Sequence, residues 1–518
     1  MFMNVNLLNK SKILLILIIS IFLIVTSLSY RNKVFSPHFV DEEDNIVLGK
    51  YLLQNEKLYK DLFSHHQPLA YITSASIQNL TNPNSIYLLI KRHRDFIILW
   101  SFIWSILILL RFGLLGTFFI IPFELLKFYL FGNLFLSESL AVYPFVYLIG
   151  ITFNTKKFNK LELILVGFCF ALVALLLSAL WLALLLIGVV FLVRKKVTVN
   201  NFLWVFVGIL PLAVVSFYFI SLPDYFHNAF YINFAYYIPT TQYEPLLVSF
   251  IRGFETPFIY FFSEVKGSQI LQVTQLICIL LIFNGLLLVR AKRFIEILLI
   301  FSILGLSNAR FTQGGMQYYS GFHTLPWQAA LILLANYTTI VVWKKYKHLF
   351  IRSTLVFFTI LVLSLSIVTA RDGLFIHHDI NKDFYINYSR QFSFGEGVRI
   401  MKSPTDNLMV VPDEWLIYWQ GDVKHATKML NYYAWMSDVP ELKAIVEDNF
   451  KQHPPTFFYC DCIGSYYGLE KYWGLYLPIK KDGQVTKLMV LKSKLKSLTQ
   501  EQQNQLKYHN FDTIIDND

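Results

Sequence analysis

Apolar segments long enough to cross a membrane recur through the first 370 residues of this 518-residue chain. A helix needs about 20 predominantly apolar residues to span a bilayer. Several segments are short or nearly fused, so the number of predicted helices is defined to within about two. The pattern predicts eleven membrane helices, at 13–28, 96–112, 113–131, 139–153, 161–177, 179–193, 201–221, 270–289, 294–308, 322–342 and 350–369.

Basic residues between these segments indicate the orientation of the chain. With the N-terminus in the cytoplasm, five clusters fall on the cytoplasmic side, as the positive-inside bias requires. They are Arg111, Lys156 to Lys160, Arg194 to Lys196, Arg290 to Arg293 and Lys344 to Lys347. We therefore predict a multi-pass protein of the cytoplasmic (inner) membrane, with the residues after Arg371 on the outer side.

The same topology places nearly every polar stretch on that outer side. These stretches are Val40–Pro68, Gly132–Glu138, the aromatic loop Pro223–Gln269 and Arg310–His323. Ionisable residues held near a bilayer are usually functional. The convergence predicts an active site that faces the bilayer from outside.

The first outer loop, residues 31–95, is too long for a simple connection. Its apolar residues recur at helical spacing, around Ile46 to Leu53 and again from Leu69 to Ile77. We expect two short helices along the membrane surface, with four consecutive acids, Asp41 to Asp44, at the start of the first.

From Arg371 onward the composition is that of a soluble domain. Short β-like runs at 408–411, 456–459 and 488–491 alternate with helical patterns at 413–420, 439–449 and 495–507. This alternation predicts a small α/β domain. The domain organisation is therefore a membrane domain, 1–370, followed by an extracytoplasmic domain, 371–518.

Composition narrows the functional classes. The chain is 55% hydrophobic and carries a formal charge of +11. In a soluble protein this charge would suggest nucleic acid, but here it lies in clusters that the topology explains, so nucleic acid is excluded as a partner. Cys460 and Cys462 lie too close in sequence for an easy disulfide and have no spaced metal ligands, so we interpret them as structural.

The first outer loop resembles that of the GT-C glycosyltransferases, polytopic enzymes that take a sugar from a polyprenyl-phosphate carrier. Their loop begins with an Asp-Glu pair, matched by Asp41-Glu42, and continues with Leu-Tyr-x-Asp and His/Pro elements. Here these are Leu58-Tyr59-Lys60-Asp61 and His66-Gln67-Pro68. The likeness is closest to the aminoarabinose and dolichyl-mannosyl-like transferases. It implies a mainly α GT-C bundle that moves the sugar with inversion.

Such a transfer needs a carboxylate that takes the proton of the acceptor as the anomeric carbon is attacked. The resemblance implies that Asp41 is this base and that Glu42 orients it or helps to hold a cation. Glu138 matches a second acid that the family carries in the next outer loop. A solvated loop start is the alternative for Asp41 and Glu42, and a helix N-terminus is the alternative for Glu138.

The departing phosphate needs positive charge or hydrogen-bond donors. By resemblance to a late segment of the family, Arg310 and His323 hold the phosphate and Tyr319 supports them, while Tyr59, Asp61 and His66 bind substrate. Arginine suits phosphate because it stays charged and offers a planar fork of donors. Headgroup contact by Arg310 and helix capping by His323 are the alternatives.

The sequence hypothesis is an inverting membrane glycosyltransferase of the hexosyl/pentosyl class, with a polyprenyl-phosphate sugar as donor and a glycan, lipid or protein as acceptor. No cofactor is certain, and if the reaction uses a divalent cation, Asp41 and Glu138 would be its ligands. The alternatives are an oligosaccharide ligase or oligosaccharyltransferase that uses a pyrophosphate carrier, and a lipid or solute transporter. The sequence contains no internal repeat, which argues against a transporter. In mid-span, Glu124 and Lys127 are expected to pair with each other.

Overall fold

The computed structural model describes residues 10–154, 158–195, 199–241, 244–262, 268–308, 321–462 and 467–513. Most of these residues are helical. The chain divides into two compact units that are interleaved in sequence. The first, the helical unit, comprises Met1–Val34, Arg94–Val215 and Gln242–Ile380, and the second, the mixed unit, comprises Phe35–His93, Ser216–Thr241 and Asn381–Asp518.

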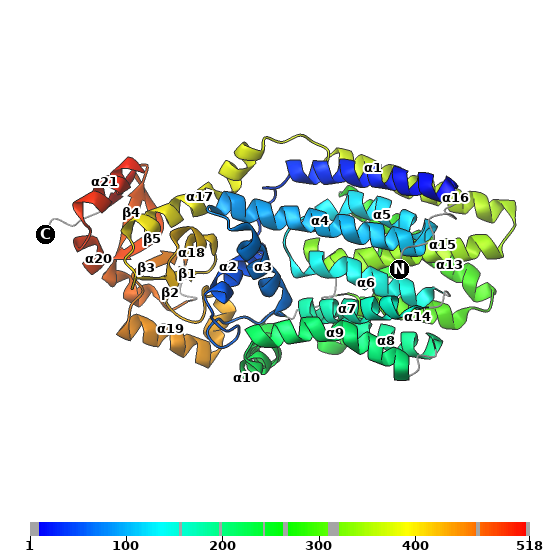
Figure 1. Ribbon diagram of the computed structural model, residues 1–518, viewed down its shortest axis with the longest axis horizontal. Coiled ribbons are helices and arrows are strands. Elements are labelled where there is room, and N and C mark those ends of the chain that lie inside the picture. The colour runs from blue at the N-terminus through cyan, green and yellow to red at the C-terminus, as the bar shows by residue number, and fades with distance from the viewer. Residues whose placement is uncertain are drawn as a thin grey trace. The chain divides into compact units, whose positions relative to one another are not determined.

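Apolar helices make up the helical unit (Figure 1). Its α-helices are α1 (Lys10–Asn32), α5 (Leu114–Leu126), α6 (Ser137–Phe153), α7 (Lys160–Leu176), α8 (Trp181–Lys195), α12 (Leu246–Phe262), α13 (Gln269–Arg290), α14 (Phe294–Leu306), α15 (Leu325–Lys345) and α16 (Leu349–Arg371), while α4 (Ile86–Phe112) and α9 (Val199–Phe219) have residues in both units. Among the described residues, short 3₁₀-helices accompany them at η2 (Lys127–Leu130), η3 (Ser178–Leu180) and η6 (Gly321–Thr324).

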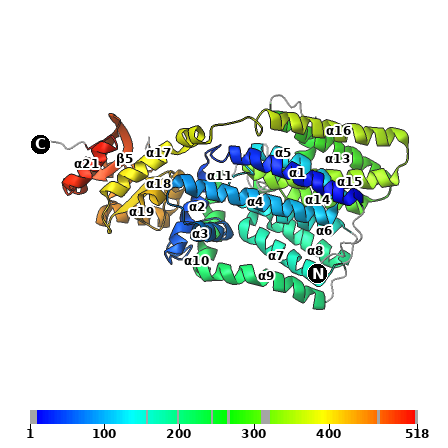
Figure 2. The same cartoon turned by 45° about the horizontal axis from the view of Figure 1, so that its top comes forward.

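Six described helices are long and apolar enough to cross a membrane. They are Ile13–Asn32, Ile86–Phe112, Asn201–Phe219, Gln269–Arg290, Gly321–Lys345 and Leu349–Arg371. Each of the eleven predicted segments contains a helix, but five of these helices are shorter, so eleven spans remain a prediction. Within the unit α13 packs against α15 and α16, and Figure 2 shows α16 above α13 and α15. The chain is thus a multi-pass helical protein.

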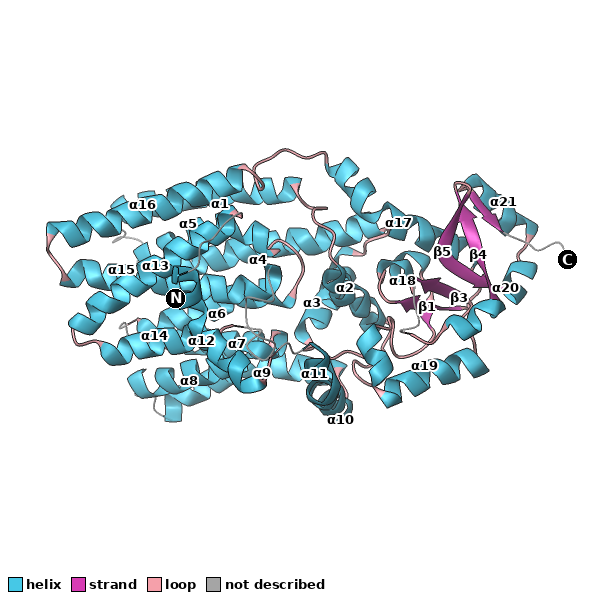
Figure 3. Cartoon of the chain, turned by 180° about the vertical axis from the view of Figure 1, so that it is seen from behind, coloured by secondary structure: helices cyan, strands magenta, loops and turns pink. Residues whose placement is uncertain are grey.

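The mixed unit holds all the described strands, drawn in magenta in Figure 3. They are β1 (Asn407–Val411), β2 (Lys424–His425), β3 (Phe457–Cys460), β4 (Tyr476–Lys481), β5 (Gln484–Leu491) and β6 (Phe511–Thr513), in the spatial order β2-β1-β3-β5-β4-β6. β1 is parallel to both β2 and β3, whereas β5 is antiparallel to β3 and β4, and β6 is antiparallel to β4.

Helices from three parts of the sequence belong to the same unit. The first loop supplies α2 (Val40–Leu53) and α3 (Leu69–Thr81), so the two helices predicted there are present, and their position along the membrane surface stays a prediction. The middle part supplies α10 (Leu222–Phe226), the π-helix η4 (His227–Tyr237) and α11 (Ile238–Thr241). The C-terminal part supplies α17 (Ile380–Met401), α18 (Leu416–Gly421), η7 (Ala434–Asp438), α19 (Pro440–Gln452), η8 (Glu470–Leu475), α20 (Lys492–Lys496) and α21 (Gln500–Tyr508).

A shared hydrophobic core explains why these parts form one unit. Phe63 from the first loop and Ile232 from η4 are buried with Met409 and Val411 of β1 and Phe458 of β3. Burial of these side chains removes apolar surface from water, which is the dominant favourable term in folding. The first loop is therefore part of the core of the α/β unit.

Three sequence predictions are wrong in detail. The predicted loop 223–269 contains α10, η4, α11 and α12, because its dense aromatic residues obscure the helical period. The helix predicted at 495–507 is two helices. Cys460 and Cys462 form a disulfide, because the chain bends after β3 and brings their Cα atoms to 5.1 Å, within the range that a disulfide needs.

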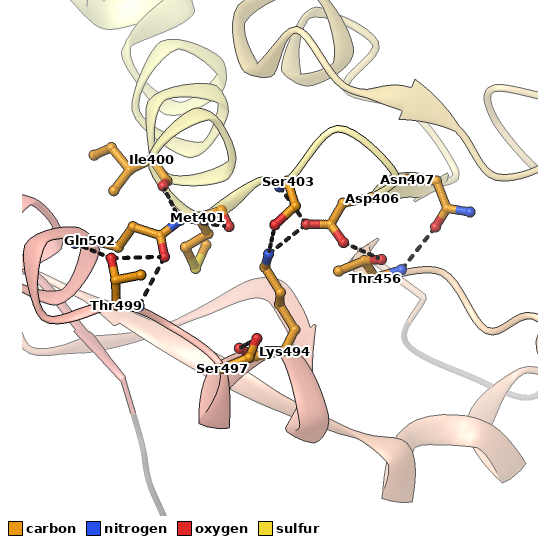
Figure 4. Close-up of polar contacts among 10 residues, drawn as sticks. All are labelled: Ile400, Met401, Ser403, Asp406, Asn407, Thr456, Lys494, Ser497, Thr499 and Gln502. Atoms are coloured by element: carbon orange, nitrogen blue, oxygen red, sulfur yellow. Dashed lines mark hydrogen bonds and ion pairs between the residues drawn. The ribbon is translucent and has the colours of Figure 1, made fainter.

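Figure 4 shows why the last helix is divided. The Thr499 hydroxyl accepts a hydrogen bond from the backbone N–H of Gln502, and the Gln502 side chain accepts one from the backbone N–H of Thr499. This capping box starts α21. The Gln502 side chain also donates to the carbonyls of Ile400 and Met401, which fastens α21 to the end of α17.

Candidate functional site

Asp41, Glu42 and Glu43 lie in the first turn of α2, where negative charge is favoured by the helix dipole, and Asp44 follows them. The structure separates them by burial. Asp41 is exposed, Glu42 and Glu43 are each 1% exposed, and Asp44 is half-buried. Of the two predicted catalytic residues on this helix, Asp41 is therefore open to solvent and Glu42 is inside the mixed unit.

Glu43 fastens the start of α2 to the C-terminal part of the mixed unit. One of its carboxylate oxygens is paired with His38, and the other accepts a hydrogen bond from the backbone N–H of Leu416 at 3.4 Å. Because His38 and Leu416 lie far apart in the sequence, Glu43 holds α2 beside α18. This role positions Asp41 and Asp44.

Asp44 is set apart by its environment. Its carboxylate accepts a hydrogen bond from the Tyr71 hydroxyl at 3.0 Å, and that hydroxyl also lies 2.8 Å from the Ser64 hydroxyl. Burial, partly offset by the Tyr71 hydrogen bond and aided by the negative charge of Asp41, raises the pKa of Asp44 to about 7. Asp41 and Asp44, three residues apart on one helix, are thus a carboxylate pair in which one proton titrates near neutral pH.

The sequence analysis did not single out Asp44. Its spacing of three residues from Asp41 places the two acids on one face of a helix. This spacing is the feature of the sequence that could have indicated a carboxylate pair. The tyrosine that contacts it comes from α3, so its pKa depends on the packing of α3 against α2.

Tyr59, Asp61 and His66, predicted to bind substrate, lie in the loop between α2 and α3. Tyr59 is buried, adopts a left-handed backbone with φ 73°, and donates its hydroxyl to the carbonyl of His66 at 2.7 Å. The Asp61 carboxylate accepts from the backbone N–H of Lys57 at 2.8 Å. Both side chains hold the shape of the loop, and the ring of His66 is exposed, so substrate binding remains a prediction for all three.

An aromatic cluster of three residues lies beside this loop. The His65 ring centroid is 4.6 Å from that of Tyr237 and 5.3 Å from that of Trp435, and the last two are 5.1 Å apart. All three side chains are half-buried. Partly exposed aromatic faces can stack on a sugar ring or an isoprenoid chain.

The C-terminal part of the mixed unit adds a further acid near α2. Burial raises the pKa of Asp413, and the charges of Glu43 and Asp461 raise this pKa as well. Arg390 and His38 act in the opposite direction. The C-terminal segment, which the sequence separates from the first loop by more than 300 residues, therefore contributes charge to the neighbourhood of the acids on α2.

Glu138 and His323, both in the helical unit, are brought together by the fold. Glu138 lies in the first turn of α6 and is 6% exposed, and His323 lies in η6. The His323 Nδ1 atom is 3.4 Å from a Glu138 carboxylate oxygen. Arg310 and Tyr319, the other predicted phosphate ligands, lie outside the described residues.

The sequence hypothesis requires Asp41, Glu138, Arg310 and His323 to line one cavity. Asp41 belongs to the mixed unit, and Glu138 and His323 belong to the helical unit. The shared cavity therefore remains a prediction.

The predicted pair of Glu124 and Lys127 is confirmed. The Lys127 Nζ atom is 2.7 Å from the Glu124 carboxylate, and both side chains are 3% exposed. Lys127 also donates to the Tyr143 hydroxyl at 2.8 Å, and Ser105 donates to Glu124 at 3.2 Å. Each charge has partners, as burial requires, so this pair is structural.

Within the ranges that the structure describes, no group of three or more His, Cys, Asp or Glu side chains has the geometry to hold a metal ion. Asp41 and Glu138, the predicted ligands for a divalent cation, lie in different units.

No model of a known protein family matches the chain, and a search of curated proteins found no significant match.

Proposed function

We propose that the protein is a membrane glycosyltransferase that moves a sugar from a polyprenyl-phosphate carrier to a hydroxyl of an acceptor on the outer side of the inner membrane. The multi-pass architecture supports a lipid-linked substrate. The observation that carries the proposal is the Asp41–Asp44 pair, in which an exposed carboxylate lies beside one whose pKa is about 7. Asp41 is the member of the pair that an acceptor can reach, and Asp44 is a neighbouring carboxyl that can hold or release a proton near neutral pH.

In the proposed step the acceptor oxygen attacks the anomeric carbon from the face opposite the phosphate. The bond between this carbon and the phosphate oxygen breaks, and the polyprenyl phosphate leaves with the bonding electrons. The proton of the acceptor passes to Asp41, the exposed carboxylate of the pair. Inversion follows because one displacement occurs.

His323 would stabilise the departing phosphate by donating a hydrogen bond. The Glu138 carboxylate, 3.4 Å from His323 Nδ1, holds one side of this ring, which leaves Nε2 as the nitrogen that would donate to the phosphate. Arg310 would supply the fixed positive charge that the resemblance assigns to it. This half of the proposal rests on residues of the helical unit and on the resemblance.

The test is transfer from radiolabelled undecaprenyl-phosphate sugars in membranes that carry the full-length protein. We expect Asp41→Asn to lower kcat by two orders of magnitude or more, because general-base catalysis contributes about 10²- to 10⁴-fold. Asp482→Asn is the matched control, since this exposed turn residue (62% exposed) has a left-handed backbone that asparagine tolerates. Addition of a chelator would show whether a divalent cation is needed. Full turnover by Asp41→Asn would remove Asp41 from the role of base.

A further inference from the structure

The carboxyl ends of β1 and β3 bring polar side chains together in the mixed unit. The strands are parallel neighbours, with Val411 opposite Cys460, so the residues that follow them meet at one edge of the sheet. Asp413 and Glu414 follow β1, and Asp461 follows β3. In sheets with parallel strands, ligands bind outside this edge.

Glu414 carries two signs of a functional position. Its backbone has φ 103°, a region that non-glycine residues rarely adopt because it is strained. Its side chain is 4% exposed, and one carboxylate oxygen is paired with Arg390. The other oxygen, Oε2, is buried and has no hydrogen-bond partner among the described residues. A buried carboxylate oxygen in this state is costly unless a ligand or water satisfies it.

Oε1 of Gln391 and the hydroxyl of Tyr459 are also buried and lack a hydrogen-bond partner among the described residues. The residues are 2% and 0% exposed. Burial raises the pKa of Tyr459 to about 12. The charges of Asp461 and Asp413 raise this pKa as well, and the charge of Arg390 lowers it, so the hydroxyl lies within reach of all three. The Gln391 Nε2 atom is 3.4 Å from His38 Nε2, and His38 is paired with Glu43. The charge of Glu43 acts on both Asp413 and Tyr459, so Gln391, Tyr459 and the segment after β1 belong to one neighbourhood.

We propose that Glu414, Gln391 and Tyr459, with Asp413 and Asp461, form a subsite that binds the hydroxyl groups of a neutral sugar ring. This inference rests on the proposed function and names the sugar-binding part of it. We call these five residues the strand-end subsite.

The mixture of unpartnered groups selects hydroxyls. A carboxylate oxygen and an amide carbonyl only accept hydrogen bonds, whereas the Tyr459 hydroxyl can donate or accept. A sugar hydroxyl can donate a hydrogen bond to Glu414 or Gln391 and accept one from Tyr459. Neither a metal ion nor an ammonium group can accept a hydrogen bond from Tyr459. A phosphate is disfavoured because Asp413, Glu414 and Asp461 would repel it.

The experiment measures binding of soluble methyl glycopyranosides to the full-length protein in nanodiscs free of glycolipid and of glycoside detergents. The panel is the methyl glycosides of glucose, galactose, mannose and N-acetylglucosamine, detected by saturation-transfer NMR and titrated. We expect at least one glycoside to bind. Tyr459→Phe should weaken it about tenfold, the effect of one net hydrogen bond. The unfolding temperature should not fall, because the variant removes an unsatisfied group. Glu414→Gln should also weaken binding.

Tyr476→Phe is the matched control. Tyr476 lies on β4, and its buried hydroxyl donates to the carbonyl of Pro455 at 2.9 Å. Loss of this bond should lower the unfolding temperature and leave glycoside affinity unchanged. The two tyrosine variants therefore move stability and binding in opposite ways if the strand-end subsite exists.

Absence of glycoside binding, or equal affinity of wild type and Tyr459→Phe, would overturn the strand-end subsite and leave water as the partner of these atoms. The binding assay needs no transfer. If Tyr459→Phe weakens glycoside binding but no sugar transfer is detected, the strand-end subsite stands and the transferase proposal fails. If transfer is detected but Tyr459→Phe leaves glycoside binding unchanged, the transferase proposal stands and the subsite fails. A higher KM for the donor in Tyr459→Phe would assign the bound ring to the donor, and a higher KM for the acceptor alone would assign it to the acceptor.

Discussion

The Asp44 carboxylate takes up a proton near neutral pH, and this has a consequence for stability. Its ordinary pKa is 3.8, and burial raises the pKa to about 7 in the folded protein. The folded state therefore holds the proton more tightly than the unfolded state. The contribution of Asp44 to stability is fully present below about pH 4 and is lost as the pH rises to about 7.

We predict that Asp44→Asn removes this dependence. Asparagine can still accept the hydrogen bond from Tyr71 and carries no charge to bury. Relative to wild type, the variant should gain about 1.4 kcal/mol in unfolding free energy for each pH unit between about 4 and 7. Thermal unfolding across this range, followed by intrinsic fluorescence, measures the difference. Asp482→Asn is the control, and parallel curves for wild type and Asp44→Asn would contradict the raised pKa.

At the scale of elements, the capping box at Thr499 decides where one helix ends and the next begins. We predict that Thr499→Ala costs about 1 kcal/mol, because the N-terminal amides of α21 lose their side-chain partner. Amide hydrogen exchange should rise in α21 and at the end of α17, to which Gln502 is bonded. Ser497→Ala is the control, since the exposed Ser497 hydroxyl bonds only within the preceding turn. Equal exchange in both variants would contradict the role of the cap.

At the scale of the whole molecule, the core of the mixed unit depends on residues far from its sheet in sequence. Phe63 is 3% exposed and packs with residues of β1 and β3. We predict that Phe63→Ala destabilises the mixed unit by about 3 to 5 kcal/mol. Hydrogen exchange in β3 should rise strongly in the full-length variant. Leu80→Ala, at an 82% exposed position of α3, should leave it unchanged, and protection of β3 in Phe63→Ala would show that the sheet forms its core alone.

Much of the local structure could be predicted from the residue pattern. The spacing of Leu69, Ile72 and Ile77 predicts a helix, and α3 occupies that position with all three buried. The runs at 408–411 and 456–459 predict strands, and β1 and β3 lie there. β2, β4 and β6 were missed, since β2 and β6 are very short and β4 contains a proline and two lysines that weaken the strand signal.

The candidate site was predictable only in part. The resemblance indicated Asp41, Glu138 and His323, each from a different stretch of the sequence. Of these, Glu138 and His323 lie together in the fold. It did not indicate the near-neutral pKa of Asp44 or the unpaired carboxylate oxygen of Glu414. Both properties arise from neighbours on other elements. Tyr71 acts on Asp44 from α3, and Arg390 acts on Glu414 from α17.

Hydrophobic length and period are properties of neighbouring residues, so the apolar helices and most strands were already decided by the order of amino acids along the chain. Burial is a property of contacts between segments that meet only after folding. The membership of residues 35–93 in the same unit as the C-terminal sheet, the near-neutral pKa of Asp44 and the strained Glu414 beside Tyr459 all depend on such contacts. A charge or hydroxyl takes its chemistry from what surrounds it, and those surroundings exist only in three dimensions.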